Sequence, residues 1–390
     1  MKYWRGYLVA AILAVIAWAL EGFAKAHRVL VDMIYPYVSR LVISTLAEWS
    51  AGSQTVLWQL WLLLGLLVIA ASIGLMIWRK WSPIQWLGWV LAGISFLVLL
   101  NTGIYGLNQY ASPLADDVRL QITDYTVSEL NQATLFFRDK ANELASSVPR
   151  DSKGNVDIGS FEELAAQAAN GYQVLTYDEA ISVFAGSSVP VKKLGWFRTR
   201  GDTGITVALT GEACVNPNVP NACLSFAMCK EMAHRMCIYS EADANFSAFL
   251  AGISNESPVF QYSAYLMAYH YCYQALSDIP TSTAKACAAE TDSGVNQLLR
   301  SDLKACQKFF GDDATAQNVN TENEQAAISD SDGVSLIVFS EYSGITDLLA
   351  SWYIQNYIAP TQQEEELPFD PYASDQVDLS GLVNAPTTAP

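Results

Sequence analysis

The stretch Cys229-Lys-Glu-Met-Ala-His-Arg235 contains the residues best suited to metal chemistry. On a helix, Lys230 and His234 lie one turn apart on the same face, and Glu231 follows the first of them. The pattern H-E-x-x-H uses this spacing to bind zinc through two imidazoles, with the Glu as general base. Here Lys230 stands at the first imidazole position, and a protonated lysine has three donors and no lone pair. We therefore expect a degenerate zinc site, with Glu231 at the general-base position and His234 as a metal ligand.

Loss of one imidazole weakens such a site. Zinc catalysis needs three protein ligands and one open position for water. Lys230 can act as a ligand only after losing a proton from a group whose reference pKa is about 10.4. We therefore expect zinc affinity and turnover to fall. The alternative is that the Lys230 ammonium replaces the cation and pairs with the carboxylates of Glu231, Glu241 or Asp243.

Three simpler interpretations of the same residues remain open. Lys230 and His234 could be the polar edge of a helix with an apolar core face, made of Phe226, Cys229, Ala233, Met236 and Cys237. Ser240-Glu-Ala-Asp243 matches an S-x-x-D helix start, so Asp243 could cap a helix. Cys229, His234 and Cys237 could form a thiolate zinc site, although their spacing matches no familiar pattern.

The composition separates the chain into two parts. The 390 residues are 51% hydrophobic, with a mean hydropathy of +0.18, which indicates a membrane portion. Residues 1–110 hold 7 of the 22 basic and 3 of the 39 acidic side chains, so the remainder holds 15 basic and 36 acidic ones, a net charge of −21. A domain this acidic repels phosphate backbones, which argues against a nucleic-acid partner.

Residues 1–110 are the expected membrane domain. Apolar runs predict three spans, at about 4–23, 56–78 and 84–105. The segment at about 29–49 mixes apolar residues with Asp32, Pro36, Arg40 and Glu48. This mixture favours an amphipathic segment lying at the membrane interface. Because Ala24-Lys-Ala26 offers a signal-peptidase site, cleavage is an alternative to a retained first helix.

Positive charges predict the orientation. Lys2 and Arg5 precede the first span, and Arg79 and Lys80 separate the second from the third, as in cytoplasmic segments. Three spans then place the large C-terminal domain outside the cytoplasm. We expect a multi-pass protein of the cell membrane with an extracytoplasmic domain.

All seven cysteines lie in the acidic part, which favours an oxidising compartment. We expect Cys214 to pair with Cys223 and Cys287 to pair with Cys306, with at least one cysteine left unpaired. The alternative is seven buried free thiols.

Residues 111–360 are expected to form one helix-dominated α+β domain. Periodicity predicts helices at about 126–148, 160–169, 222–239, 243–254, 259–277, 281–309 and 334–357. Gly204–Leu209 predicts a strand, and Gly211–Asn221 predicts a loop by its Asn and Pro content. Residues 311–332 predict a mobile loop, and the acidic, Pro-rich residues 361–390 predict a disordered tail.

Four stretches in the same order carry a family resemblance: Thr210-Gly-Glu-Ala-Cys-Val-Asn216, Cys229-Lys-Glu-Met-Ala-His-Arg235, Glu241-Ala-Asp-Ala-Asn-Phe-Ser-Ala-Phe-Leu250 and Phe260-Gln-Tyr-Ser-Ala-Tyr-Leu266. They resemble a bacterial domain-of-unknown-function family with three spans and an extracytoplasmic zinc-metallopeptidase-like domain. The resemblance implies a mainly α fold, in which three N-terminal transmembrane helices precede a zincin-like α+β domain.

The same resemblance implies roles for individual residues. It makes His234 the second His ligand and Glu231 the general base, in a gluzincin-like arrangement. Asp243 stands where the carboxylate ligand belongs. The chain departs from the family pattern at Lys230, which replaces a His, and at Asp243, which replaces a Glu.

Five further residues could line a cleft in such a domain: Glu212, Glu241, Asn245, Tyr262 and His270. Glu212 could touch a substrate or be a solvated loop carboxylate. His270 is the one other imidazole in the outer domain that could replace the missing ligand. Tyr262 belongs to a tyrosine stripe at helical spacing, which is more typical of packing than of a cleft.

Three functions follow from these expectations. The first is a non-catalytic metallopeptidase-like membrane protein that binds a peptide or an envelope component. The second is a zinc metallopeptidase that works with an altered ligand set. The third is a structural or assembly protein that acts through its membrane helices.

Overall fold

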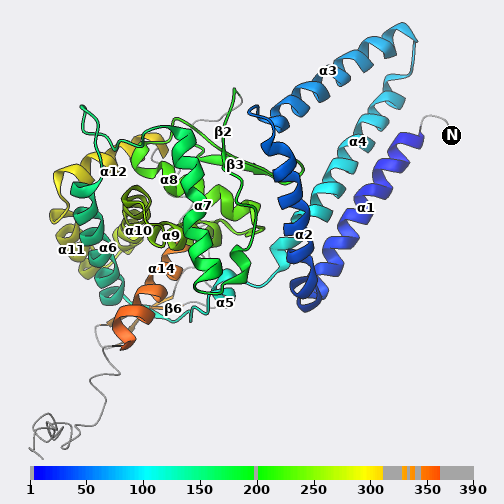
Figure 1. Cartoon of the computed structure of the whole chain (residues 1–390). Coiled ribbons are helices and arrows are strands. Elements are labelled where there is room, and N and C mark those ends of the chain that lie inside the picture. The colour runs from blue at the N-terminus through cyan, green and yellow to red at the C-terminus, as the bar shows by residue number, and fades with distance from the viewer. Residues whose placement is uncertain (1–3, 197–200, 311–326, 332–333, 339–343, 361–390) are drawn as a thin grey trace, which may run out of the picture.

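The computed structural model describes residues 4–196, 201–310, 327–331, 334–338 and 344–360. Figure 1 shows two parts, a group of long helices from the N-terminal third and a globular, mainly helical domain beside it. The predicted tail, 361–390, lies outside the described residues, as does most of the predicted loop at 311–332.

Among the described residues, four helices are long and apolar enough to cross a membrane, where the sequence predicted three. They are α1 (Arg5–Ala26), α2 (Arg28–Ala51), α3 (Leu57–Trp78) and α4 (Pro83–Ile104). The additional helix is α2, which covers the segment predicted to lie at the interface. It continues through Pro36, and its apolar residues outweigh its few charged ones. The prediction of three membrane-length helices was therefore one too few.

Helices α1 and α4 pack side by side and run in the same direction (Figure 1). At one end, a Cβ on Gly6 would lie 2.5 Å from the carbonyl carbon of Gly88, so small residues allow the backbones to approach closely. At the other end, Ala24 packs with Leu107, which follows α4. The start of α1 and the turn before α4 therefore lie at one end of this pair. The globular domain contacts the other end, where the rings of Tyr105 and Tyr239 are tilted against each other with their centroids 5.4 Å apart.

Helix α2 lies against the globular domain. The Arg40 guanidinium donates to the carbonyls of Met236 (3.2 Å) and Ser182 (3.1 Å). Nearer the end of α2, Gly211 adopts φ +66°, and a Cβ there would lie 2.3 Å from the Ala47 nitrogen. Only glycine fits so close an approach. Helix α3, by contrast, buries little of its surface.

The globular domain begins with short elements and two capped helices. The chain passes through η2 (Gly106–Tyr110), α5 (Leu114–Asp117) and β1 (Tyr125–Thr126) into α6 (Val127–Ser147). After α7 (Phe161–Tyr177) come η3 (Ser182–Phe184) and β2 (Lys192–Lys193). Capping boxes at Thr126 with Glu129 and at Ser160 with Glu163 begin α6 and α7.

Helix α7 is longer than predicted, because Gly171 is not a stop signal. A Cβ at this position would lie 1.8 Å from the Ala251 carbonyl oxygen. The glycine therefore allows α7 to pack closely on α9 (Glu241–Ile253) while the helix continues through it.

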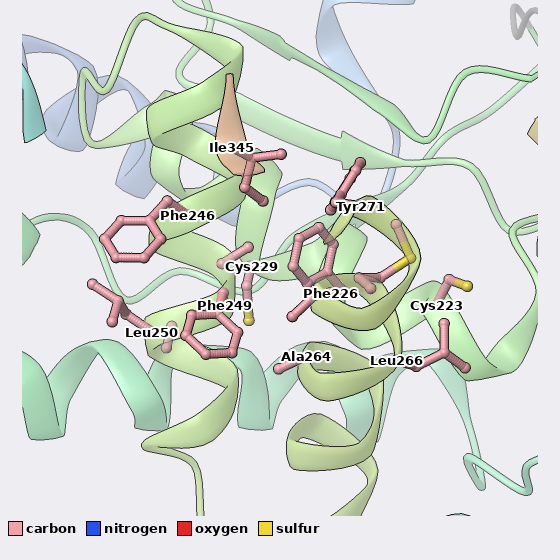
Figure 2. Close-up of a cluster of buried hydrophobic side chains, with 14 of the residues drawn as sticks. Cys223, Phe226, Cys229, Phe246, Phe249, Leu250, Ala264, Leu266, Tyr271 and Ile345 are labelled. Atoms are coloured by element: carbon pink, nitrogen blue, oxygen red, sulfur yellow. The ribbon is translucent and has the colours of Figure 1, made fainter. Parts of the chain in front are cut away.

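The core of the domain is formed by α8 (Asn221–Arg235), α9 and α10 (Pro258–Asp278), which pack on one another and on α6 and α14 (Ile345–Tyr353). Figure 2 shows the junction of these helices, where aromatic and aliphatic side chains meet around Cys229 of α8. The labelled neighbours include Phe226, Phe249 and Ile345. The motif helix is therefore deeply buried on one side.

The remaining elements differ in part from the predicted ones. The predicted helix at 281–309 is two helices, α11 (Ser282–Ser293) and α12 (Gln297–Phe310). They separate at Gly294, where a Cβ would lie 2.4 Å from an Arg138 nitrogen. The start of the predicted helix at 334–357 is instead strand β6 (Val334–Val338), which pairs with β1 and β5 (Ala327–Ser331). The π-helical turn η4 (Ile354–Ile358) follows α14.

A second small sheet has the order β2-β4-β3. Strand β3 (Gly204–Val207) is the predicted strand, and it pairs antiparallel with β4 (Glu212–Val215). The loop prediction for 211–221 was wrong at its first residues, because the Asn and Pro residues that suggested a loop begin only after β4.

One disulfide joins Cys223 of α8 to Cys306 of α12. Both predicted pairings were therefore wrong. Cys214 is buried and free, and Cys287 is half-buried and free. The disulfide links segments 83 residues apart in the sequence, a distance over which sequence spacing carries no pairing information.

Candidate functional site

The last two turns of α8 place Lys230, Glu231 and His234 on the side of the helix that faces the start of α9. The Lys230 ammonium lies 3.6 Å from Glu231 Oε1 and 3.3 Å from Glu241 Oε2. The other oxygen of Glu241 lies 3.2 Å from His234 Nε2. The structure therefore brings together Lys230 and His234, which occupy the two predicted metal-ligand positions, with the carboxylates of Glu231 and Glu241. We call these four residues the Lys230 cluster.

The connection between α8 and α9 decides which acidic residue joins the cluster. Cys237 has φ +71°, a left-handed conformation that ends α8 abruptly. Ser240 then caps α9 by accepting a hydrogen bond from the Asp243 nitrogen. Glu241 is the first residue of α9 and reaches back to α8. Asp243 is buried and lines a different cavity from the one beside Lys230 and Glu241.

Strand β3 fixes Glu231 from the other side. Thr206 Oγ1 lies 2.9 Å from both the carbonyl oxygen and Oε2 of Glu231, and these two acceptors share its single hydroxyl proton. A Cβ on Gly204 would lie 2.7 Å from Glu231 Cγ, so the glycine leaves the room that this side chain occupies. Glu231 is only 2% exposed. Its carboxylate is therefore positioned by the sheet and compensated by Lys230.

The cluster favours the protonated forms of its bases. Burial lowers the pKa of Lys230, but Glu231 and Glu241 outweigh it, and the pKa lies above its ordinary value. For His234, burial again lowers the pKa and the two carboxylates again raise it, with a net increase. Burial raises the pKa of Glu241, while His234 and Lys230 lower it well below its ordinary value. The Glu241 side chain is 58% exposed, so water screens these pairs.

His234 is held in one orientation. Its Nδ1 lies 2.9 Å from the Ile238 carbonyl oxygen, to which it donates. Nε2 faces Glu241, but without the alignment of a hydrogen bond. This nitrogen can therefore offer a lone pair when the ring is neutral or form an ion pair when it is protonated.

The donor set does not fit zinc. Within the described residues, no group of three or more His, Cys, Asp and Glu side chains is placed to hold a metal ion. The position of the first imidazole is taken by an ammonium group that already pairs with two carboxylates. Its protonated nitrogen has no lone pair for a metal.

A cavity of about 310 Å³ opens beside the Lys230 cluster. Its polar lining includes Lys230, Glu241, Asn245, Asp202 and Thr203, and its apolar lining includes Phe226, Met267 and Phe310. Tyr271 also lines it, with its hydroxyl 3.5 Å from Asn245 Oδ1. Sequence reasoning missed Tyr271 because the tyrosine stripe, at 262, 265, 269 and 273, follows a neighbouring face of α10. Asn245, predicted as a cleft residue, is placed in this cavity.

Glu212 holds a membrane helix instead of lining a cleft. Its two oxygens accept hydrogen bonds from the backbone nitrogens of Leu57 and Trp58, both at 2.8 Å. Lys192 Nζ donates to it at 2.8 Å. The hydrogen bonds from Leu57 and Trp58 cap the first turn of α3, and Glu212 is only 1% exposed. Neither predicted role, a substrate contact or a solvated carboxylate, describes this arrangement.

Tyr262 and His270 lie on α10 outside the 310 Å³ cavity. The Tyr262 hydroxyl donates to Asp302 at 2.5 Å, and Arg150 pairs with the same carboxylate at 2.8 Å. These contacts join α10, α12 and the segment after α6. Burial lowers the pKa of His270 to about 4, so its imidazole is neutral at physiological pH. The structure places it in contact with Tyr271 rather than in the Lys230 cluster.

Comparison with curated proteins and with solved structures finds no match. A family model does match, over residues 31–325, a range that contains most of α2, all of α3 and α4, the Lys230 cluster and the 310 Å³ cavity. The match covers more than half of the chain, and the chain belongs to the family described as "Protein of unknown function (DUF3810)".

Proposed function

We propose that this chain is a membrane-anchored, metallopeptidase-like protein that binds peptides without cleaving them. The observation that carries the proposal is the position of the Lys230 ammonium, 3.3 Å from Glu241 and 3.6 Å from Glu231. It gives the buried carboxylate of Glu231 the positive charge that a metal would supply. Because the nitrogen is protonated, it activates no water, and the reaction of a zinc peptidase has no catalyst here.

The cavity beside the cluster supports a peptide as the ligand. Strand β3 lies at the edge of its sheet, and its first residue, Gly204, lines the cavity. An extended peptide can add to such an edge through main-chain hydrogen bonds, with a side chain in an adjoining pocket. Lys230 and Asn245 offer polar partners, and Phe226 and Met267 offer apolar contact. A peptide of the cell envelope fits this mixture.

The arrangement of the helices supports an extracytoplasmic domain. Arg5 at the start of α1 and the Arg79-Lys80 turn before α4 lie at the end of the α1 and α4 pair that is remote from the domain. Cytoplasmic segments carry such positive charges. The Cys223–Cys306 disulfide is independent support, because disulfides persist in oxidising compartments.

The contacts of helix α2 distinguish its position from that of the other three long helices. It is long and apolar enough to span, but Arg40 and Gly211 tie it to the globular domain along its length. We therefore propose that α1, α3 and α4 cross the membrane and that α2 lies at the interface between the bilayer and the domain.

The test of the proposed function uses the full chain purified in detergent. We expect substoichiometric zinc by elemental analysis and no cleavage of a fluorogenic peptide library. A photo-crosslinking peptide library should label residues of the 310 Å³ cavity. Stoichiometric zinc together with cleavage that Glu231→Gln abolishes would overturn the non-catalytic part. Labelling elsewhere, or no labelling, would overturn the peptide-binding part.

A matched pair of variants tests the role of Lys230. Lys230→His supplies the imidazole that is missing from the first position of the motif, and it should raise the zinc content of the purified protein. Lys285→His places the same substitution on the exposed surface of α11 and should leave the zinc content unchanged. An equal zinc content in both variants would show that the scaffold around residue 230 is not a metal site with one ligand exchanged.

A further inference from the structure

A second cavity, of about 560 Å³, is larger than the one beside the Lys230 cluster and lies apart from it. It lies between α2, the segment that follows α4 and the connection between α8 and α9. Arg28, Asp32, Pro36 and Arg40 line it from one face of α2, at helical spacing. We call this space the α2 cavity.

The position of the α2 cavity relative to the spans is set by chain distance. Arg28 lies two residues beyond the last residue of α1, which is about 3 Å along a helix axis. Asn108 lies four residues beyond the last residue of α4. The head-group layer on each side of a bilayer is roughly 5–8 Å thick, from the total of about 40–45 Å and a core of about 30 Å. If α1 and α4 cross the membrane, these residues lie at the depth of lipid head groups.

The charges of the α2 cavity have both signs. Its acidic residues are Asp32, Asp117, Asp124 and Asp243, and its basic residues are Arg28 and Arg40. An anionic head group would meet an excess of negative charge. A zwitterionic group can use both signs, since Arg28 and Asp32 lie one turn apart on α2.

Two buried polar side chains, Arg40 and Asn108, line the α2 cavity. Arg40 is 9% exposed and is held by the carbonyls of Met236 and Ser182. Asn108 is 4% exposed and donates its amide to Ser39 Oγ. Its Oδ1 accepts no hydrogen bond from any residue in the described part of the chain. A buried acceptor without a donor is costly, and a ligand that carries N–H groups would satisfy it.

We propose that the α2 cavity binds the head group of a zwitterionic phospholipid, with its phosphate beside Arg28 and its ammonium among Asp32, Asp117 and Asn108. The acyl chains extend from the mouth of the cavity into the bilayer. The proposal rests on the membrane anchoring in the proposed function but not on the Lys230 cluster. Lipid bound in this way ties the orientation of the domain to the membrane surface.

The test is a lipid titration of the full chain in detergent micelles, followed by native mass spectrometry. The probes are dioleoyl phosphatidylethanolamine, dioleoyl phosphatidylglycerol and free O-phosphoethanolamine. The variant Arg28→Gln/Asp117→Asn removes one charge of each sign from the cavity. The control Lys25→Gln/Asp116→Asn makes the same changes at neighbouring exposed residues that do not line it.

We expect phosphatidylethanolamine to bind more tightly than the other two probes. The cavity variant should weaken it by about three- to tenfold, the effect of losing two partly exposed charge pairs, and the control should not. Equal affinity for the two lipids, or equal affinities of the two variants, would mean ordinary lipid contact and overturn the proposal. Tighter binding of free phosphoethanolamine would overturn the lipid as ligand. Release of the protein from membranes by carbonate would instead contradict the membrane anchoring. A failure of the lipid proposal can therefore be told apart from a failure of the proposed function.

Discussion

The Lys230 ammonium lies 3.3 Å from one oxygen of Glu241, whose other oxygen lies 3.2 Å from His234. One carboxylate at the start of α9 thus bridges two nitrogen-bearing side chains at the end of α8. The two positions that would hold a metal through imidazoles in an H-E-x-x-H helix are joined here by a carboxylate instead. When His234 is protonated, the two positive charges of the cluster match the two carboxylates.

Replacing Lys230 should therefore destabilise the domain. Lys230→Gln removes the positive charge beside Glu231, whose side chain is 2% exposed. A buried charge without its partner costs several kcal/mol, but the exposed Glu241 contributes little to this cost. We expect a loss of about 2 kcal/mol, or about 4–8 °C in Tm, for a domain of this size. Thermal unfolding in detergent measures it.

Two comparisons make this result specific. Lys285→Gln, on the exposed surface of α11, should change Tm little. The double variant Lys230→Gln/Glu231→Gln should recover part of the loss, since it removes both buried charges. A Lys230→Gln protein as stable as the Lys285→Gln control would contradict the role of the ammonium.

The stability of the domain should depend on pH through His234 and Glu241. The pKa of His234 is raised above 6.5, so its stabilisation is complete below pH 6.5 and is lost as pH rises through the raised value. The pKa of Glu241 is lowered from 4.5, so its stabilisation is present above pH 4.5 and is lost as pH falls through the lowered value. We expect the highest Tm between about pH 4.5 and 6.5.

The measurement is Tm across pH 5 to 9 for matched histidine variants. His234→Gln should flatten the fall of Tm on the alkaline side. His270→Gln should keep that fall, because the pKa of His270 is about 4 and the ring is neutral throughout this range. A slope that survives His234→Gln unchanged would assign the pH dependence to other groups.

The sequence predicted the helices of the core because their apolar periodicity is strong. Helices α6, α8, α9 and α10 all lie close to the predicted ranges. Gly171 misled the prediction for α7, since a glycine after Asn reads as a stop signal. It is a packing site instead, and only the approach of the Ala251 backbone explains it.

The candidate site was predicted in part. Residues on one helix are placed by helical spacing alone, so Lys230, Glu231 and His234 fall together as expected. The carboxylate from α9 depends on the turn between the helices. A left-handed Cys237 is uncommon for a residue that is not glycine, and no local pattern signals it. As a result Glu241, the first residue of α9, faces His234.

Loss of the Glu212 carboxylate should loosen the start of α3. In Glu212→Gln, one oxygen remains to serve two backbone donors, and Lys192 loses its buried partner. We expect a loss of about 2–4 kcal/mol and faster proteolysis in the segment between α2 and α3, residues 52–56. Limited proteolysis with mass spectrometry measures the cleavage.

The matched control is Glu162→Gln, an exposed residue in the first turn of α7. It should change neither Tm nor the cleavage pattern. If Glu212→Gln behaved like this control, the contact between the globular domain and α3 would not depend on the carboxylate.

The disulfide should stabilise the wall of the 310 Å³ cavity. It joins Cys223, which lines the cavity, to Cys306 of α12, four residues before the cavity residue Phe310. Closing a loop of 83 residues is worth about 4.5 kcal/mol in the chain-entropy account. Cys306→Ser should therefore lower Tm and speed hydrogen exchange in α12, whereas Cys287→Ser, at a free half-buried thiol, should do neither. Non-reducing peptide mapping should show Cys223 joined to Cys306. A Cys214–Cys223 peptide in its place would restore the pairing predicted from the sequence and leave α12 without its covalent link to α8.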